Sequence, residues 1–244
     1  MQHSYVGDIG DYLKLSLLNA LQEGNRLGVA WWLFYDEKPK ADGRHIGYLS
    51  DRARWRKYDP EVFDLLLEVV ANERNVSGLE VLPFLSWVRF SAEVVPKGIA
   101  DRKLWLLRMV DTFSDRNIVF FDPDNGLAPP GFRPGASNSG KSIELDEIKM
   151  FRKEGRTLVV YHHQTRFKGG HQAEIRHWAT QLPHEFRRVD VVRCRPWSPR
   201  LYFILDASDD LIRRTEALVD RWDGHMAINP HLSQPRHIAM SSLE

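Results

Sequence analysis

The spacing of apolar and polar residues predicts alternating helices and strands along the chain. Residues 11–23 carry leucines at positions 13, 15, 17, 18 and 21, which predicts a largely buried helix ending at Gly24. Residues 29–35 are apolar and aromatic, as in a strand covered on both faces. Further helices are expected at 59–72, 102–114, 144–154, 169–181 and 209–222. Further strands are expected at 76–85 (one or two short ones), 118–121, 157–161, 189–195 and 201–206.

This alternation predicts an α/β fold, with a mostly parallel sheet and helices on both of its faces. The last two strands are separated only by residues 196–200, which predicts a C-terminal antiparallel hairpin. From His231 onward the periodicity is lost. We therefore expect a single α/β domain over residues 1–230 and a C-terminal tail over residues 231–244.

Composition narrows the class of protein. The 244 residues are 43% hydrophobic and 27% charged, as in ordinary globular domains. No apolar run approaches the length of a membrane span, and no secretory signal opens the chain, so no membrane partner is expected. The single cysteine, Cys194, excludes an intramolecular disulfide and fits a cytoplasmic protein. A net charge of +1 means that a nucleic-acid site would be a local patch.

The sequence Asp-Pro-Asp-Asn-Gly at residues 122–126 directly follows the apolar strand expected at 118–121. Carboxylates at the end of a buried strand lie where open α/β sheets bind their ligands. Pro123 biases Asp122 toward an extended conformation, so that carboxylate is expected to be held stiffly. The same five residue types are also typical of a simple turn, and this alternative remains open.

Polar residues also follow two other expected strands. Asp36 and Glu37 end the first one, and His162, His163 and Gln164 follow the strand at 157–161. The carboxyl ends of parallel strands share one edge of a sheet, so we expect these clusters to share a cleft with residues 122–126. Adjacent histidines in strand geometry point to opposite faces, so at most one of the two faces that cleft.

The N-terminal segment offers a second candidate site. Gly7 and Gly10 allow a tight loop before the first helix, whose N-terminus carries partial positive charge. Lys14, one turn into that helix, could reach an anion near the loop. Asp11 could line the same site or could act only as a helix cap.

These two segments carry a resemblance to a known family. Gly-Asp-x-x-Asp-x-Leu-Lys at residues 7–14 resembles the opening motif, Gly-Asn-x-x-Asp-x-Leu-Lys, of the adenine-N6 methyltransferases acting on 23S ribosomal RNA. Their Asp-Pro-Pro-Tyr motif falls on residues 122–125, and their Ile-Trp-Tyr-Pro strand on residues 159–162. The chain also resembles uncharacterised bacterial proteins that share Gly-Asp-x-Gly-Asp-Tyr-Leu-Lys and Asp-Pro-Asp-Asn-Gly-Leu.

The methyltransferase resemblance implies a Rossmann-like, methyltransferase-like fold that binds S-adenosylmethionine. It also implies that Asp122 binds the exocyclic amine of a base. Two positions depart from the family. Asn125 stands where the family has its stacking tyrosine, and residues 35–40 replace its glycine-rich cofactor loop.

The leading functional hypothesis is N-methylation of a base in RNA, DNA or a nucleotide, with S-adenosylmethionine as the cofactor. The candidate catalytic residues are Asp122, Asp124, Asn125 and His162. The candidate cofactor-binding residues are Gly7, Asp8, Asp11, Lys14 and Asp36.

Two alternatives remain open. One is a phosphoesterase or nuclease in which Asp122, Asp124 and Glu147 hold Mg²⁺ or Mn²⁺, with His162 or His163 as base. The other is a non-catalytic RNA- or DNA-binding protein on a degenerate methyltransferase fold, because Trp178 and Trp197 lie among basic residues. Those basic residues are Arg166, Lys168, Arg176, Arg187, Arg188, Arg193, Arg195 and Arg200.

Overall fold

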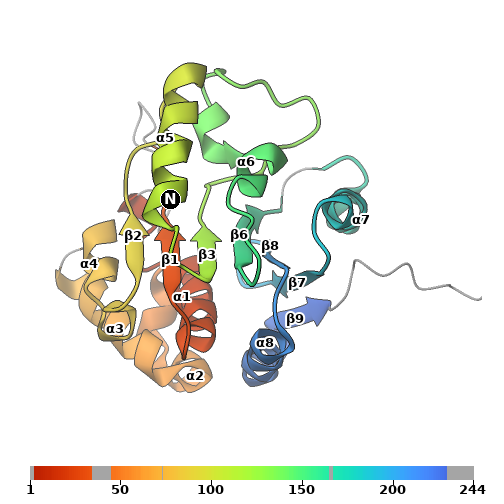
Figure 1. The fold of residues 1–244 in the computed structure, drawn as a ribbon. Coiled ribbons are helices and arrows are strands. Elements are labelled where there is room, and N and C mark those ends of the chain that lie inside the picture. The colour runs from red at the N-terminus through yellow and green to blue at the C-terminus, as the bar shows by residue number, and fades with distance from the viewer. Residues whose placement is uncertain (1–2, 35–44, 73, 165–166, 230–244) are drawn as a thin grey trace, which may run out of the picture.

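The computed structural model describes residues 3–34, 45–72, 74–164 and 167–229. Within these ranges the chain has an α/β fold with a seven-stranded mixed sheet, in the order β2-β1-β3-β6-β8-β7-β9 (Figure 1). The strands are β1 (Leu27–Ala30), β2 (Arg89–Ser91), β3 (Ile118–Phe121), β6 (Thr157–His163), β7 (Val189–Cys194), β8 (Arg200–Leu205) and β9 (Met226–Asn229). Two further strands, β4 (Gly126–Leu127) and β5 (Ser142–Ile143), pair only with each other.

Strand directions divide the sheet into two parts. Strands β2, β1, β3 and β6 are parallel neighbours. Strand β8 is antiparallel to both β6 and β7, and β9 is antiparallel to β7. From β1 the chain goes outward to β2 and then returns to β3 on the other side of β1, so the strand order reverses there. Ligands of open α/β sheets bind outside the carboxyl ends of the strands at such a reversal.

Helices cover both faces of the sheet (Figure 1). On one face lie α1 (Ile9–Gln22), α3 (Pro60–Asn72), α4 (Val76–Glu80) and α8 (Asp209–Arg221), and on the other α5 (Ile99–Thr112), α6 (Leu145–Lys149) and α7 (Gly170–Gln181). Strand β3 shows why both layers are needed. Ile118 and Phe120 belong to the first hydrophobic core, Val119 and Phe121 to the second, and all four side chains are fully buried.

Helix α1 confirms the leucine pattern: its leucines at 13, 15, 17, 18 and 21 are all fully buried, and the helix packs against α8 and α3. The prediction for residues 76–85 was wrong. Instead of strands, they form α4, where Asn75 caps the helix by accepting a hydrogen bond from the Gly78 N–H, and a 3₁₀ helix at Pro83–Leu85. The edge strand β2 comes only afterwards, at Arg89–Ser91.

The first strand is also shorter than expected. Strand β1 ends at Ala30, and Trp32 has a left-handed φ of +52°, which interrupts the regular pairing. Leu33 then forms an isolated parallel bridge with Val94.

Among the described residues, no helix is both long enough and apolar enough to cross a bilayer.

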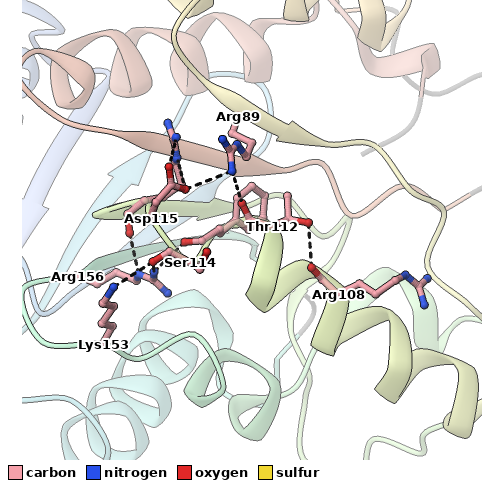
Figure 2. A network of polar contacts seen from close by, with 9 residues as sticks. Arg89, Arg108, Thr112, Ser114, Asp115, Lys153 and Arg156 are labelled. Carbon is pink, nitrogen blue, oxygen red and sulfur yellow. Dashed lines mark hydrogen bonds and ion pairs between the residues drawn. The ribbon is translucent and has the colours of Figure 1, made fainter.

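At the edge opposite the strands' carboxyl ends, basic side chains cap the last turn of α5 (Figure 2). Arg156, which is buried, donates hydrogen bonds to the carbonyl oxygens of Phe113, Ser114, Arg116 and Phe151. These carbonyls follow the end of α5 and precede β3 and β6, where backbone acceptors would otherwise lack partners.

We expect Arg156→Met to lower the free energy of unfolding by about 2–4 kcal/mol, because it leaves buried carbonyl oxygens without donors. Urea denaturation measures this change. Lys153→Met is the matched control, since exposed Lys153 makes a single hydrogen bond, to the Ser114 carbonyl, and its loss should cost about 0.5 kcal/mol. Equal effects of the two substitutions would contradict this account of the network.

Candidate functional site

A pocket of about 400 Å³ lies at the carboxyl ends of β3 and β6, beside the N-terminus of α1. This volume falls in the range of small-molecule sites. The pocket is lined by Tyr5, Asp8, Gly10, Asp11, Lys14, His45, Asp122, Asp124, Asn125, Lys141, Tyr161, His163, Ser198 and Arg200. The structure therefore brings together the N-terminal segment, the Asp-Pro-Asp-Asn segment and one of the two adjacent histidines.

The N-terminal segment forms a tight loop that caps α1. Asp8 is the cap residue, and its Oδ1 accepts a hydrogen bond of 3.0 Å from the Asp11 N–H. Asp11 in turn accepts a bond of 2.9 Å from the Gly7 N–H at Oδ2. Gly7 has a φ of +77°, and a Cβ there would lie 2.2 Å from Val70 Cγ2, so no other residue type fits without strain. The cap role considered for Asp11 thus belongs to Asp8, while Asp11 is available to another partner.

That partner is Lys14. Its Nζ lies 2.7 Å from Asp11 Oδ1 and 2.7 Å from Asp122 Oδ2, so one ammonium group joins two motifs that are far apart in the sequence. All three side chains are at most 4% exposed. The Nζ atom also lies 5.7 Å from the centre of the Trp31 ring and 5.9 Å from that of Tyr161, within the range of cation–π attraction.

The charges of this cluster follow from burial and proximity. Burial lowers the pKa of Lys14, but Asp11 and Asp122 outweigh that effect and raise its pKa, so the amine stays protonated. Burial also raises the pKa of Asp11 to about 6, despite the opposing effect of Lys14. At neutral pH, two carboxylates share one ammonium, so we expect the cluster to carry a net negative charge.

The backbone of residues 122–127 is fixed on both sides. The Asp122 N–H donates to the Ala30 carbonyl at 3.0 Å, and the Asn125 N–H donates to the Lys141 carbonyl at 2.8 Å. Gly126 has a φ of +89°, and a Cβ there would lie 2.4 Å from His162 Cα, so this position requires glycine. The turn alternative is therefore also correct, since residues 122–126 do turn, but they do so with Asp122, Asp124 and Asn125 lining the pocket.

The two adjacent histidines have different surroundings because β6 continues through His163, which places them on opposite faces. His162, predicted as catalytic, does not line the pocket: it is 1% exposed and packs beside Trp178 of α7. Its Nδ1 accepts a hydrogen bond of 3.0 Å from the Leu127 N–H, so in a neutral ring Nε2 carries the proton and faces Glu174 Oε1 at 3.1 Å. His162 thus supports the loop that carries Asp122.

His163 is the histidine that lines the pocket. Burial lowers its pKa, and the neighbouring positive charge of Arg200 lowers it further. Its Nδ1 lies 3.4 Å from the Tyr161 hydroxyl. Its imidazole is therefore neutral at pH 7 and able to accept a proton.

From the sequence, Arg200 is expected only as one of several basic surface residues, and its place in the pocket was not predicted. It is only 4% exposed and lines the pocket. Its Nη2 donates to Ser198 Oγ, but Nε and Nη1 have no hydrogen-bond partner among the described residues. A Cβ at Gly10 would lie 2.5 Å from Nη1, so the guanidinium approaches the N-terminus of α1 closely. Buried donors of this kind favour an acceptor in the pocket.

The other two candidate residues are Asp36 and Glu147. Asp36 falls outside the described residues. Glu147 is not in the pocket, because it forms a buried ion pair with Arg102, whose Nη2 lies 2.7 Å from Oε2. In the part of the chain that the structure describes, no three His, Cys, Asp or Glu side chains are grouped so that they could hold a metal ion.

The basic residues and tryptophans that suggested nucleic-acid binding differ in their surroundings. Arg188 is paired with Asp190 and Asp209, and Trp178 is buried. Trp197, by contrast, is 50% exposed.

Two comparisons with known proteins were made for the whole chain. Neither the models of known protein families nor the sequences of curated proteins gave a match.

We expect Asp11 to make stability depend on pH. Its pKa is raised in the folded state from 3.8 to about 6, so its stabilising contribution is complete below pH 3.8 and is lost as pH rises through 6. The unfolding free energy of the native chain should therefore fall, relative to that of Asp11→Asn, by about 2 kcal/mol between pH 4 and 7. Urea denaturation across this range measures the difference.

Asp64→Asn is the control for that series, since Arg56 lowers the pKa of the Asp64 carboxyl instead. The native chain should gain stability relative to this variant as pH rises through the acid range. A constant difference between the native chain and Asp11→Asn would show that Asp11 does not titrate in this way.

His162→Leu should lower the free energy of unfolding by about 2–4 kcal/mol, because it removes the partner of the buried Leu127 N–H and of Glu174. His163→Leu should cost about 1 kcal/mol or less, since within the described residues the hydrogen bonding of His163 amounts to a long contact with the Tyr161 hydroxyl. Denaturant unfolding of both variants tests the difference, and the opposite ranking would disprove the supporting role of His162.

Proposed function

We propose that this chain is an S-adenosylmethionine-dependent N-methyltransferase with a Rossmann-like fold, acting on a base of RNA, DNA or a nucleotide. The observation that carries the proposal is the Lys14 ion-pair cluster, which brings Asp122 and the N-terminal loop to one pocket. The strand order supports the Rossmann-like assignment, because it reverses beside β1 and the pocket lies outside the neighbouring carboxyl ends.

The lining of the pocket fits the chemistry of the cofactor. When bound, S-adenosylmethionine would supply an activated methyl group on a positively charged sulfur. The unpartnered Nε and Nη1 atoms of Arg200 are donors suited to its carboxylate. Asp8 and Asp124 are acceptors suited to its ammonium and hydroxyl groups. The net negative charge of the cluster formed by Asp11, Lys14 and Asp122 favours a cationic ligand.

On the substrate side, the pocket presents hydrogen-bond acceptors for an exocyclic amine. Lys14 holds the Asp122 carboxylate at Oδ2, so this group can orient the amine by accepting an N–H bond. The Asn125 side chain adds an amide carbonyl at the exposed edge of the same loop. His163, neutral at pH 7, is the group placed to accept the proton that the amine loses on methylation.

A phosphoesterase or nuclease using Mg²⁺ or Mn²⁺ has weaker support. Two of its three carboxylates already have cationic partners, since Lys14 pairs with Asp122 and Arg102 pairs with Glu147. To bind a metal ion, Asp122 and Glu147 would both have to give up these buried ion pairs. The non-catalytic alternative differs from our proposal only in the absence of transfer, so it is an outcome of the experiment below.

Thermal unfolding with S-adenosylhomocysteine or S-adenosylmethionine tests cofactor binding. A ligand at 100 times its dissociation constant stabilises a protein by about 2.7 kcal/mol, which for this chain length raises Tm by about 5–10 °C. Arg200→Met should abolish most of that rise. A rise with Mn²⁺ in place of the cofactor would support the phosphoesterase or nuclease and overturn our proposal.

Transfer of a labelled methyl group to RNA, DNA and free nucleotides tests the activity. Asp122→Asn keeps the shape of the side chain but removes the charge, so we expect transfer to fall about 100-fold or more while the cofactor-induced rise in Tm remains. Asp146→Asn, on the exposed side of α6, is the control and should not alter transfer. Cofactor binding without transfer to any of these acceptors would favour the non-catalytic alternative.

A further inference from the structure

Trp197 occupies an unusual position at the rim of the pocket. It lies in the turn between β7 and β8, one residue before Ser198 and three before Arg200, both of which line the pocket. Its side chain is 50% exposed, and its φ of +59° is left-handed, a conformation that is strained for a bulky residue. Strain of this kind persists where the surrounding structure imposes it, and it is often found at ligand-binding sites.

The exposed ring rests on a buried aromatic group. The centre of the Trp197 ring lies 5.3 Å from that of Trp55 and 6.4 Å from that of His45, which lines the pocket. Trp55 is 3% exposed and stacks on His225 at 5.1 Å. One face of Trp197 is thus supported by packed rings, while half of its surface remains open to a ligand.

Exposed cationic residues accompany this aromatic cluster. The Arg54 guanidinium lies 5.1 Å from the centre of the Trp55 ring, and Lys57 Nζ lies 5.1 Å from that of Tyr58. The backbone N–H of Arg195 donates to the His225 carbonyl. All three cationic residues are exposed, and none forms an ion pair with another described residue.

We propose that Trp197, His45, Arg54, Lys57 and Arg195 form a surface, here the Trp197 surface, that binds a single-stranded segment of nucleic acid. One base stacks on Trp197, and the phosphates beside it contact Arg54, Lys57 and Arg195. Stacking on a side chain requires an unpaired base, which selects a single strand over a duplex. The adjoining nucleotide then extends past His45 into the pocket. This inference rests on the proposed function and deepens it: the substrate is a polynucleotide strand rather than a free nucleotide.

Fluorescence anisotropy of a labelled mixed-sequence RNA or DNA strand of about 12 nucleotides, without cofactor, tests this surface. We expect Trp197→Ala to weaken binding about 5- to 150-fold, the effect expected for loss of one stacked base. Trp197→Gly is the decisive variant, because glycine accepts the left-handed φ and should preserve folding while losing binding equally. Trp197→Phe, which keeps an aromatic face, should retain most of the affinity.

Trp87→Ala is the matched control. Trp87 is 86% exposed but lies beside Leu27, at the amino end of β1 and away from the pocket, so its removal should leave affinity unchanged. Lys57→Gln and Arg195→Gln should each reduce the slope of log affinity against log salt by about 0.7, as expected for one lost phosphate contact to a single strand.

Three results would overturn the Trp197 surface: no binding of either strand, equal loss in Trp87→Ala and Trp197→Ala, or duplex binding as tight as that of the single strand. These outcomes are separable from failure of the proposed function. Trp197-dependent binding without cofactor binding or transfer would remove the methyltransferase proposal alone. Transfer to a free nucleotide by a chain that binds no strand would remove the Trp197 surface alone.

Discussion

The ammonium of Lys14 is the interaction on which the arrangement of the pocket depends. Two buried carboxylates in one place would repel each other, and burying an unpaired charge is costly. Lys14 removes both difficulties, because its Nζ reaches Asp11 and Asp122 at the same distance of 2.7 Å. The first helix is thereby joined to the end of β3, and both acidic side chains are buried at the sheet edge with a cationic partner.

Much of this arrangement could be predicted from the sequence, for reasons that particular residues make plain. The leucines of α1 and the apolar run of β3 are buried as their periodicity indicates, since one core covers each face of the sheet. The rule that ligand sites form at the carboxyl ends of parallel strands predicts that residues 162–164 meet residues 122–126, and His163 does line the same pocket as Asp122. The N-terminal segment was a second candidate site, linked to the first only by the methyltransferase resemblance. The segment 76–85 was predicted wrongly, because a short apolar run fits a buried strand or a buried helix equally well, and here it forms the Asn75-capped helix α4.

The histidines and Arg200 show what the sequence could not supply. The sequence predicts that at most one histidine faces the pocket. Which one depends on where β6 ends, and β6 extends two residues further than expected, to His163. Arg200 was indistinguishable from surface arginines, because its burial arises from pairing of β8 with β6 and β7, a long-range contact. Local patterns therefore identify which residues carry chemistry more readily than which face of an element presents them.

The reversed direction of β8 has a consequence for how such a protein could diversify. A strand of the parallel part contributes its last residues to this edge of the sheet, whereas β8 contributes its first, so the β7–β8 connection lies at the mouth of the pocket. Changes in that short connection would alter what the mouth admits, while the buried ion pairs below it stayed intact. Evolution or design could thus change which ligands the pocket accepts without changing the buried groups that hold the pocket together.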